Sequence, residues 1–462
     1  MREPIPFPLD QPALDIDLGG TRVRRTVHPS GLRVLTEYMP GVRSASVGFW
    51  VGVGSRDEQS ENDAARGSLG STHFLEHLLF KGTPTRDAYA IATSFDRVGA
   101  ESNAMTAKEY TCYHAKARDV DLEGAVEVLA DMVTNSVLDQ GEFENEREVI
   151  LEELAMAADD LADVASERFF EAALGEHPLG RPIGGTPETI RAARRDDVNE
   201  HYAHQYDPST LVVTAAGAVD HDRLVELVLR ALAASGDPRW SIEADRVPVR
   251  RSASPDAGAE STAAPEAVAT PHATPHVDIT EKPSEQVNVI VGTTGLRAGD
   301  PRRFALGLMN SVLGGGMSSR LFQEIREKRG LAYTAYSFGA SYSDAGLFGM
   351  YAGTAPQKAA EVVELARTEL AKIADAGITA DERERALGQI AGSSALALED
   401  SDTRMGRLGR SELGTGELYD LDTSLERFHA VSDADVRDIA AVLHRQPATI
   451  VAVGEVSRST LR

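Results

Sequence analysis

Two histidines and one glutamate in the segment STHFLEHLLFKG, residues 71–82, have the types and spacing of a metal site. On a helix, His73 and His77 lie one turn apart on the same face, so both imidazoles can reach one zinc ion. Glu76 borders that face, where its carboxylate can act as a general base. The order His-x-x-Glu-His inverts the common zinc-protease motif and is far more specific than two histidines alone, which usually belong to a core helix. The segment therefore predicts a catalytic zinc site.

A catalytic zinc ion needs a third protein ligand and leaves one position open for water. The acidic run GEFENEREVILEELAMAADD, residues 141–160, is expected to form an amphipathic helix that can supply this ligand. Glu146 and Glu153 lie two turns apart on one side of that helix. Most of its acidic side chains are expected to form a solvated face. Periodicity alone leaves four candidates for the third ligand: Glu142, Glu146, Glu152 and Glu153.

The residues around the two histidines are expected to hold the first helix in place. Ser71 or Thr72 can cap its N-terminus, and Gly82 can end it. Its apolar side chains would pack against the core and keep the histidines still. They are Phe74, Leu75, Leu78, Leu79 and Phe80.

These motifs resemble the pitrilysin family of metallopeptidases, which includes insulin-degrading enzyme and the β-subunit of mitochondrial processing peptidase. In that family, His-x-x-Glu-His is followed by a distant glutamate that completes the zinc site. Here Glu153 lies 76 residues after His77. The resemblance implies that Glu153 is the third ligand of one zinc ion per chain, that Glu146 supports the site and that Glu76 is the general base.

The resemblance also extends to residues that would contact substrate. Asn103 and Ala104, in the segment GAESNAMTAKEYTCY, match an edge strand that pairs with extended peptides. Such pairing binds the peptide backbone and imposes little sequence preference. In the second half, Arg326 and Tyr333 of REKRGLAY match an Arg and Tyr pair that reaches the substrate or the developing oxyanion.

The implied activity is that of a zinc-dependent endopeptidase acting on peptides or on unfolded, presequence-like segments. Relatives of this length form half of a closed chamber, so the resemblance implies a homodimer. Arg326 and Tyr333 would then act on the zinc site of the partner chain. One alternative is a non-catalytic structural or peptide-binding subunit of a processing complex, which would lack zinc. Another is a zinc hydrolase that acts on a different kind of amide.

Composition narrows the class of protein. The 462 residues include 72 acidic and 47 basic side chains, and the net charge of −25 argues against nucleic acid as a partner. No apolar run is long enough for a membrane helix, and the first ten residues lack the pattern of a secretory signal. The single cysteine, Cys112, is expected to be a buried structural thiol. Together these features favour a cytoplasmic protein.

The chain divides into two halves that resemble each other. We expect a zinc-binding catalytic domain over residues 20–245, a flexible linker rich in Ala and Pro over 246–284, and a homologous second domain over 285–462. Each half ends in a helix and then a strand, and Gly217 and Gly454 occupy matching places after those strands. Strands and helices are mixed without regular alternation. The expected fold is therefore α+β, with a mixed or antiparallel sheet packed against helices in each half.

Overall fold

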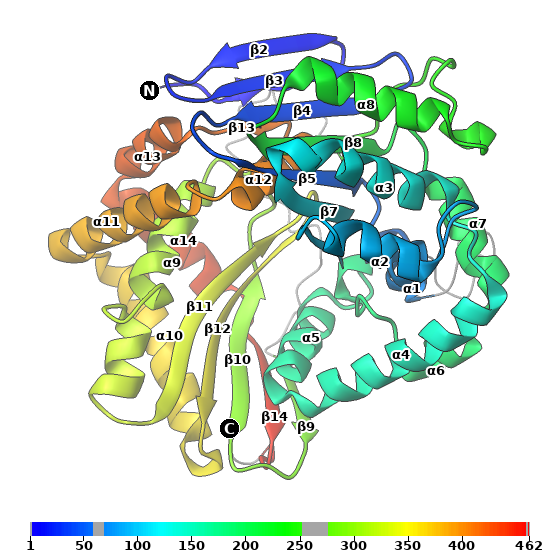
Figure 1. Ribbon diagram of the computed structural model, residues 1–462. Coiled ribbons are helices and arrows are strands. Elements are labelled where there is room, and N and C mark those ends of the chain that lie inside the picture. Colours follow the sequence, from blue (N-terminus) through cyan, green and yellow to red (C-terminus); the bar gives the residue numbers. More distant parts are fainter. Residues whose placement is uncertain (1, 59–68, 252–275, 459–460, 462) are drawn as a thin grey trace.

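The computed structural model describes residues 2–58, 69–251, 276–458 and 461. Within these residues the principal strands form two sheets, and Figure 1 shows one in the upper part of the view and the other at the lower left. Helices pack against both sheets, so the predicted α+β architecture with two similar halves is confirmed. None of the helices in this part of the chain combines the length and the apolar composition needed to cross a bilayer.

Within the described residues, the first sheet contains seven strands. In spatial order they are β2 (Ala13–Asp17), β3 (Arg22–Val27), β4 (Arg33–Tyr38), β8 (Leu211–Gly217), β5 (Ser44–Val51), β7 (Thr111–Arg118) and β6 (Glu101–Thr106). Strands β4 and β8 pair in parallel, and the other neighbours pair antiparallel. Every residue of β8 is buried, which explains why this strand has no alternation of polar and apolar residues. Strand β6 lies at the edge and is largely exposed.

The second sheet contains five strands. In spatial order they are β11 (Ala332–Ser341), β12 (Gly346–Thr354), β10 (Val287–Thr294), β14 (Thr449–Gly454) and β9 (His276–Glu281). Strands β14 and β9 pair in parallel, and the other neighbours pair antiparallel. A separate short sheet joins β1 (Ile5–Pro6) to β13 (Glu417–Leu418) and so brings the N-terminal region to the second half of the chain.

The two large sheets share one topology. In each, the last strand of the half, β8 or β14, lies between a parallel neighbour and an antiparallel neighbour. Gly217 and Gly454 end these strands with φ values of 114° and 140°. A Cβ at either position would collide with a carbonyl oxygen, that of Ser44 or of Gln286. The same steric demand at equivalent positions supports the predicted duplication.

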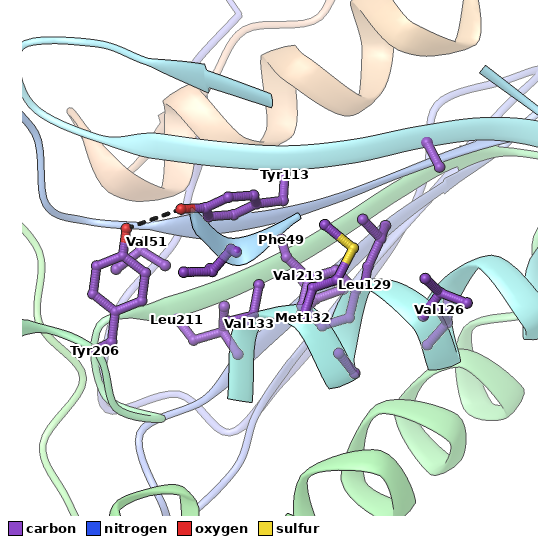
Figure 2. Close-up of a cluster of buried hydrophobic side chains, with 14 of the residues drawn as sticks. Phe49, Val51, Tyr113, Val126, Leu129, Met132, Val133, Tyr206, Leu211 and Val213 are labelled. Carbon is purple, nitrogen blue, oxygen red and sulfur yellow. Dashed lines mark hydrogen bonds between the residues drawn. The ribbon is translucent and has the colours of Figure 1, made fainter. Parts of the chain in front are cut away.

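The described residues of the first half include the helices α1 (Ser71–Leu79), α2 (Ala88–Asp96), α3 (Leu122–Asn135), α4 (Gln140–Asp159), α5 (Leu161–Leu174), α6 (Pro187–Ala192), α7 (Arg195–Gln205) and α8 (His221–Ala233). The core lies between the first sheet and its helices. Figure 2 shows part of it, where Leu129 and Val133 of α3 lie against Phe49 of β5, and where the hydroxyls of Tyr113 and Tyr206 meet at 3.4 Å.

The second half contains the helices α9 (Arg303–Gly314), α10 (Ala359–Ala376), α11 (Ala380–Ala397), α12 (Ser401–Leu413), α13 (Leu421–Ala430) and α14 (Asp433–Arg445). Helices α9, α10 and α14 form a core with the second sheet. A π-helical turn, η5 (Phe322–Glu327), leads from α9 towards β11.

One helix of each half packs against the sheet of the other half. Helix α5 packs on the second sheet, where Phe169 lies in one apolar cluster with Ile290 and Val451. Helix α12 packs on the first sheet, where Met405 and Leu408 join a cluster with Trp50 and the buried Cys112. The expected domain limits at residues 245 and 285 therefore do not separate the packing units. The physical reason is that each sheet has two apolar faces and both must be covered.

The C-terminal part of the segment expected to be a flexible linker, residues 246–284, differs from that expectation. Residues 252–275 lie outside the described residues. The segment His276–Glu281, also assigned to the linker, forms β9 and completes the parallel edge of the second sheet. Valine and isoleucine alternate with polar residues in HVDITE, which is the pattern of a half-buried strand. The segment was assigned to the linker because the stretch before it is rich in Ala and Pro.

The N-terminus of helix α1 is capped by a residue outside residues 71–82, the segment from which the helix was predicted. Ser71 and Thr72 belong to the first turn, and the N-cap is Gly70 with a φ of 92°, so the expected cap is wrong. The side chain of Glu58 accepts hydrogen bonds from the backbone N–H groups of Gly70 and Thr72, both at 2.7 Å. Glu58 is 2% exposed. A buried carboxylate thus satisfies two of the donors that a helix N-terminus leaves unpaired.

Helices α1 and α4 are joined by a pair of aromatic rings. Phe74 of α1 and Phe143 of α4 stack with ring centroids 4.2 Å apart and an interplanar angle of 8°. Both side chains are fully buried. The stack fixes the relative position of the two helices that carry the predicted metal ligands, because rigid rings in a packed core cannot shift without opening a cavity.

We expect Phe143→Ala to lower the free energy of unfolding by about 3–5 kcal/mol, since it removes a buried ring and leaves a cavity between α1 and α4. Hydrogen exchange measured by mass spectrometry should show faster exchange of the α1 amides in the variant. Phe169→Ala, a buried ring between α5 and the second sheet, is the matched control and should destabilise the protein without that local change. Equal protection of α1 in both variants would contradict the prediction.

We expect Glu58→Gln to lower the free energy of unfolding by about 1–3 kcal/mol, because an amide has one acceptor oxygen and leaves one buried N–H of α1 unpaired. Burial raises the pKa of Glu58 to about 7. The folded state therefore disfavours the ionised carboxyl, so wild-type stability should fall as pH rises from 4.5 to about 7, and Glu58→Gln should lack this fall. Denaturation is compared at pH 4.5, before most of this loss. Glu188→Gln, in the exposed first turn of α6, is the control and should change stability by less than about 0.5 kcal/mol.

Candidate metal centre

Three of the predicted residues converge on one point. His73 and His77 come from α1, and Glu153 comes from the last two turns of α4. The Nε2 atoms of the two histidines are 3.3 Å apart. Glu153 Oε2 lies 3.4 Å from His77 Nε2 and 3.8 Å from His73 Nε2. In the described parts of the chain, this is the one group of three or more potential metal-binding side chains whose ligand atoms lie within 4.8 Å of one another.

These distances fit a tetrahedral zinc ion. Two nitrogens that each bind zinc at about 2.0–2.1 Å in tetrahedral geometry are roughly 3.3 Å apart, the separation seen between the two imidazoles. Two imidazoles and one carboxylate are a donor set of catalytic zinc sites. The Glu153 side chain is 47% exposed, so the cluster is open to solvent on its α4 side. The residues present therefore fit zinc and leave room for a further ligand.

Glu146 orients one of the two imidazoles. Its Oε2 lies 2.9 Å from His77 Nδ1, and its Oε1 lies 2.6 Å from Lys81 Nζ. Glu146 is 4% exposed, and Lys81 neutralises its buried charge. A histidine that donates from Nδ1 presents the lone pair of Nε2, the atom that faces His73 and Glu153. The predicted supporting position of Glu146 thus agrees with the geometry.

The second imidazole is kept neutral by its surroundings. Burial, and secondarily the charge of His77, lowers the pKa of His73 to about 4. The backbone at Gly184 passes close to this ring, since a Cβ there would lie 3.7 Å from His73 Nδ1 and 3.1 Å from a methyl of Leu154. A neutral imidazole has a lone pair to offer a metal ion.

Glu76 lies on α1 beside the cluster and contacts the edge strand β6. Its Oε2 accepts a hydrogen bond from the hydroxyl of Thr106, the last residue of β6. Burial raises the pKa of Glu76 above its usual value, and the hydrogen bonds from Thr106 act in the opposite direction. A carboxyl whose pKa is moved towards neutrality can both take up and release a proton.

The predicted peptide-binding residues lie on the same edge strand. Asn103 and Ala104 belong to β6, which among the described residues pairs with β7 alone. Asn103 is exposed, and its side-chain oxygen accepts a hydrogen bond from the N–H of Ala104 at 2.8 Å. Because Thr106 at the end of this strand contacts Glu76, an extended peptide added to β6 would run beside the cluster.

The predicted Arg and Tyr pair lies elsewhere. The Arg326 guanidinium lies 4.6 Å from the ring centroid of Tyr333, whose side chain points to solvent with 74% exposed. Tyr333 is near the start of β11, while Ser341 at the other end adjoins the turn that contacts the first half. At about 3.3 Å per residue those ends are roughly 26 Å apart. Within the described residues, no hydrogen bond or ion pair joins Arg326 or Tyr333 to the cluster.

The structure also shows which acidic residue of α4 lies in the cluster. It places further residues at the site that the sequence patterns did not indicate. Glu142 is half-buried and Glu152 is exposed, and both lie outside the cluster. Lys81, Thr106 and Glu58 contact the site or its helix, yet none was predicted. Lys81 follows His77 by four residues, which is a helical spacing that could have indicated it. Glu58 lies 12 residues before Gly70, outside the helix, and no spacing pattern connects it to the helix.

Two successive stretches of the chain match two descriptions of one family. Residues 33–187 match the family described as Insulinase (Peptidase family M16), and residues 192–390 match the one described as Peptidase M16 inactive domain. The first range contains the metal cluster, Glu76 and β6, and the second contains Arg326 and Tyr333.

Similar proteins cover almost the whole chain. An uncharacterized zinc protease of Streptomyces coelicolor is 45% identical over 430 residues, which are 93% of this chain and 89% of that protein. The uncharacterized zinc protease YmxG of Bacillus subtilis is 35% identical over 421 residues, which are 91% of this chain and 95% of that protein.

A solved protease from Helicobacter pylori shares the fold with a TM-score of 0.79 at 23% identity, over 94% of this chain and 99% of that one. A structure titled peptidase M16 inactive domain, from Pseudomonas fluorescens, also has a TM-score of 0.79, at 19% identity over 94% and 97% of the two chains. Identity above 30% over nine-tenths of the chain, with the inverted His-x-x-Glu-His helix in place, shows that this chain belongs to peptidase family M16, the insulinase or pitrilysin family.

Proposed function

We propose that this chain is a zinc-dependent endopeptidase that hydrolyses peptides or unfolded, presequence-like segments. The observation that carries the proposal is the convergence of two imidazoles and a carboxylate at the spacing of a tetrahedral zinc ion, with Glu76 beside them. The relatives in Streptomyces and Bacillus are named zinc proteases, which supports both the metal and the reaction class.

His73, His77 and Glu153 would hold the zinc ion. When bound, zinc supplies Lewis-acid chemistry, which favours the ionisation of water and polarises a carbonyl group. Glu146 keeps His77 in the tautomer that leaves Nε2 available, and Lys81 forms an ion pair with Glu146. The ligand shell is therefore prepared by side chains that do not themselves bind the ion.

Glu76 would move the proton. Its carboxylate takes a proton from the water that attacks the scissile carbonyl carbon, and it returns that proton to the departing amide nitrogen as the C–N bond breaks. Burial moves the pKa of Glu76 upwards, which suits a group that must act first as base and then as acid. Strand β6 would align the peptide through backbone hydrogen bonds, so cleavage would depend more on extended conformation than on sequence.

Digestion of a mixed peptide library, read by mass spectrometry with and without a metal chelator, tests the proposal. We expect wild-type protein to cleave the library and the chelator to abolish cleavage. Glu76→Gln should lower turnover by about 10³-fold or more while zinc content stays near one ion per chain, because the amide cannot accept the proton. Near-normal turnover in this variant would remove Glu76 from the role of base.

Other results of the same experiment would point to the alternatives. Purified protein without zinc and without cleavage would indicate a non-catalytic subunit. Zinc without cleavage of any peptide would indicate a hydrolase for another amide. Glu142→Gln, at a half-buried glutamate in the first turn of α4 outside the cluster, is the matched control and should keep both zinc and turnover.

We also propose that the active form is a homodimer in which Arg326 and Tyr333 serve the metal centre of the partner subunit. Two observations support this arrangement. The pair lies far along β11 from the turn that adjoins the first half, and the exposed ring of Tyr333 is available to another molecule. A closed chamber formed by two copies would shield the reaction from bulk solvent.

Isolated mixed dimers test this sharing. If residues are shared across the dimer, a dimer of Glu76→Gln and Tyr333→Phe chains has one complete site and should show about half of wild-type activity. A dimer of the double variant with wild-type chain should then be nearly inactive. The reverse pattern would show that Tyr333 acts within its own chain. The two dimers carry the same substitutions in different distributions, so each is the control for the other.

A further inference from the structure

Glu76 is held from the strand beside it. The hydroxyl of Thr106 donates to Glu76 Oε2, and among the described residues the side-chain hydrogen bonds of Glu76 are with Thr106. Thr106 is half-buried at the end of β6, where it pairs with Thr111 of β7. Thr106 therefore supplies the hydrogen bonds that hold this carboxylate, and its hydroxyl is a neutral donor to one of the two oxygens.

The backbone around Thr106 is firmly fixed. The turn after it closes with a hydrogen bond from Ala107 N–H to the carbonyl of Tyr110 at 2.8 Å. Ser55 N–H donates to Ala107 at 3.1 Å, and Arg56 N–H donates to Lys108 at 3.0 Å. Gly54 packs so closely that a Cβ there would collide with the carbonyl of Ala107.

The Lys108 ammonium adds a bond of 2.6 Å to the carbonyl of Arg181. Thr106 thus precedes a turn that is hydrogen-bonded to two other segments, one at Ser55 and Arg56 and one at Arg181. A threonine side chain is also stiff about its first torsion angle, so its hydroxyl direction follows the backbone closely.

A general base is effective only when its carboxylate points at the proton it must remove. Glutamate has three side-chain torsion angles, and an unrestrained carboxylate would spend much of its time in unproductive orientations. No cationic side chain forms an ion pair with Glu76 among the described residues. A neutral hydroxyl restrains the carboxylate without the strong reduction of basicity that an arginine or lysine partner would cause.

We propose that Thr106 is a positioning residue for the proposed peptidase reaction: its hydroxyl holds one oxygen of Glu76 so that the other faces the attacking water. This inference rests on the proposed function. Because Thr106 ends the strand that would bind the peptide, the same residue also sets the distance between the bound peptide backbone and the base.

The test compares Thr106→Val, which keeps the shape and removes the hydroxyl, with Thr106→Ser, which restores it. Thr111→Val is the matched control, because Thr111 lies opposite in the same hairpin and its hydroxyl donates to the carbonyl of Val53 at 2.9 Å, away from Glu76. Each protein is first checked for folding by circular dichroism and for zinc content. If Thr106→Val does not fold, Thr106→Ala takes its place.

For Thr106→Val we expect kcat to fall about 10- to 100-fold, the usual effect of removing a side chain that orients a catalytic group, with KM within about 2-fold. Thr106→Ser should recover most of kcat, and Thr111→Val should keep kcat while it lowers thermal stability. Crystal structures of the metal-free proteins provide a readout that does not depend on activity. The Glu76 carboxylate should have one orientation in the wild type and more than one in Thr106→Val.

Three results would overturn the inference. One is an unchanged kcat in Thr106→Val, and another is an equal loss of kcat in Thr111→Val, which would make the effect a general loss of stability. The third is an unchanged, single orientation of Glu76 without the hydroxyl. Wild-type protein that shows no chelator-sensitive cleavage would overturn the proposed function together with this inference, whereas the other results leave that function standing.

Discussion

The structure brings together three groups that do not attract one another. Two imidazole nitrogens and a carboxylate oxygen lie within 4.8 Å, and each can present a lone pair to the same point. Without an ion the contacts among these three side chains add little stability, so the rest of the fold must hold them in place. The stack of Phe74 on Phe143 joins the two helices, and Glu146 binds His77 from the side away from the cluster. The packing of the core therefore holds the three ligand side chains in place before any ion binds.

The support for this centre reaches into the second half of the chain. The segment Gly54–Glu58 caps α1 through Glu58 and packs against the turn that carries Thr106. In the same segment, Arg56 forms a paired hydrogen bond with Asp344 in the turn between β11 and β12. Helices α5 and α12 cross between the halves in the same way. The metal centre lies in one half, but the residues that position it belong to both.

The duplicated sheets have taken different roles. Strands β6 and β11 are equivalent edges, each ending its sheet beside an inner antiparallel neighbour. Only β6 lies next to a metal cluster in the described residues, because only α1 carries the two histidines. Strand β11 instead carries Tyr333 and a largely exposed face. One half therefore contains the candidate metal centre, and the other presents Tyr333 on an edge strand.

The sequence alone determined the features that depend on local spacing. A helix has a fixed period, so the positions of His73, Glu76 and His77 predicted a shared face, and the repeat of strand and glycine predicted two similar sheets. Tertiary structure decided the rest. Four glutamates of α4 were equivalent by periodicity, and only packing against α1 selected Glu153. The cap from Glu58, the bond from Thr106 and the exchange of α5 and α12 are contacts between separate elements of the chain. No periodicity records such contacts, because they depend on how whole elements pack.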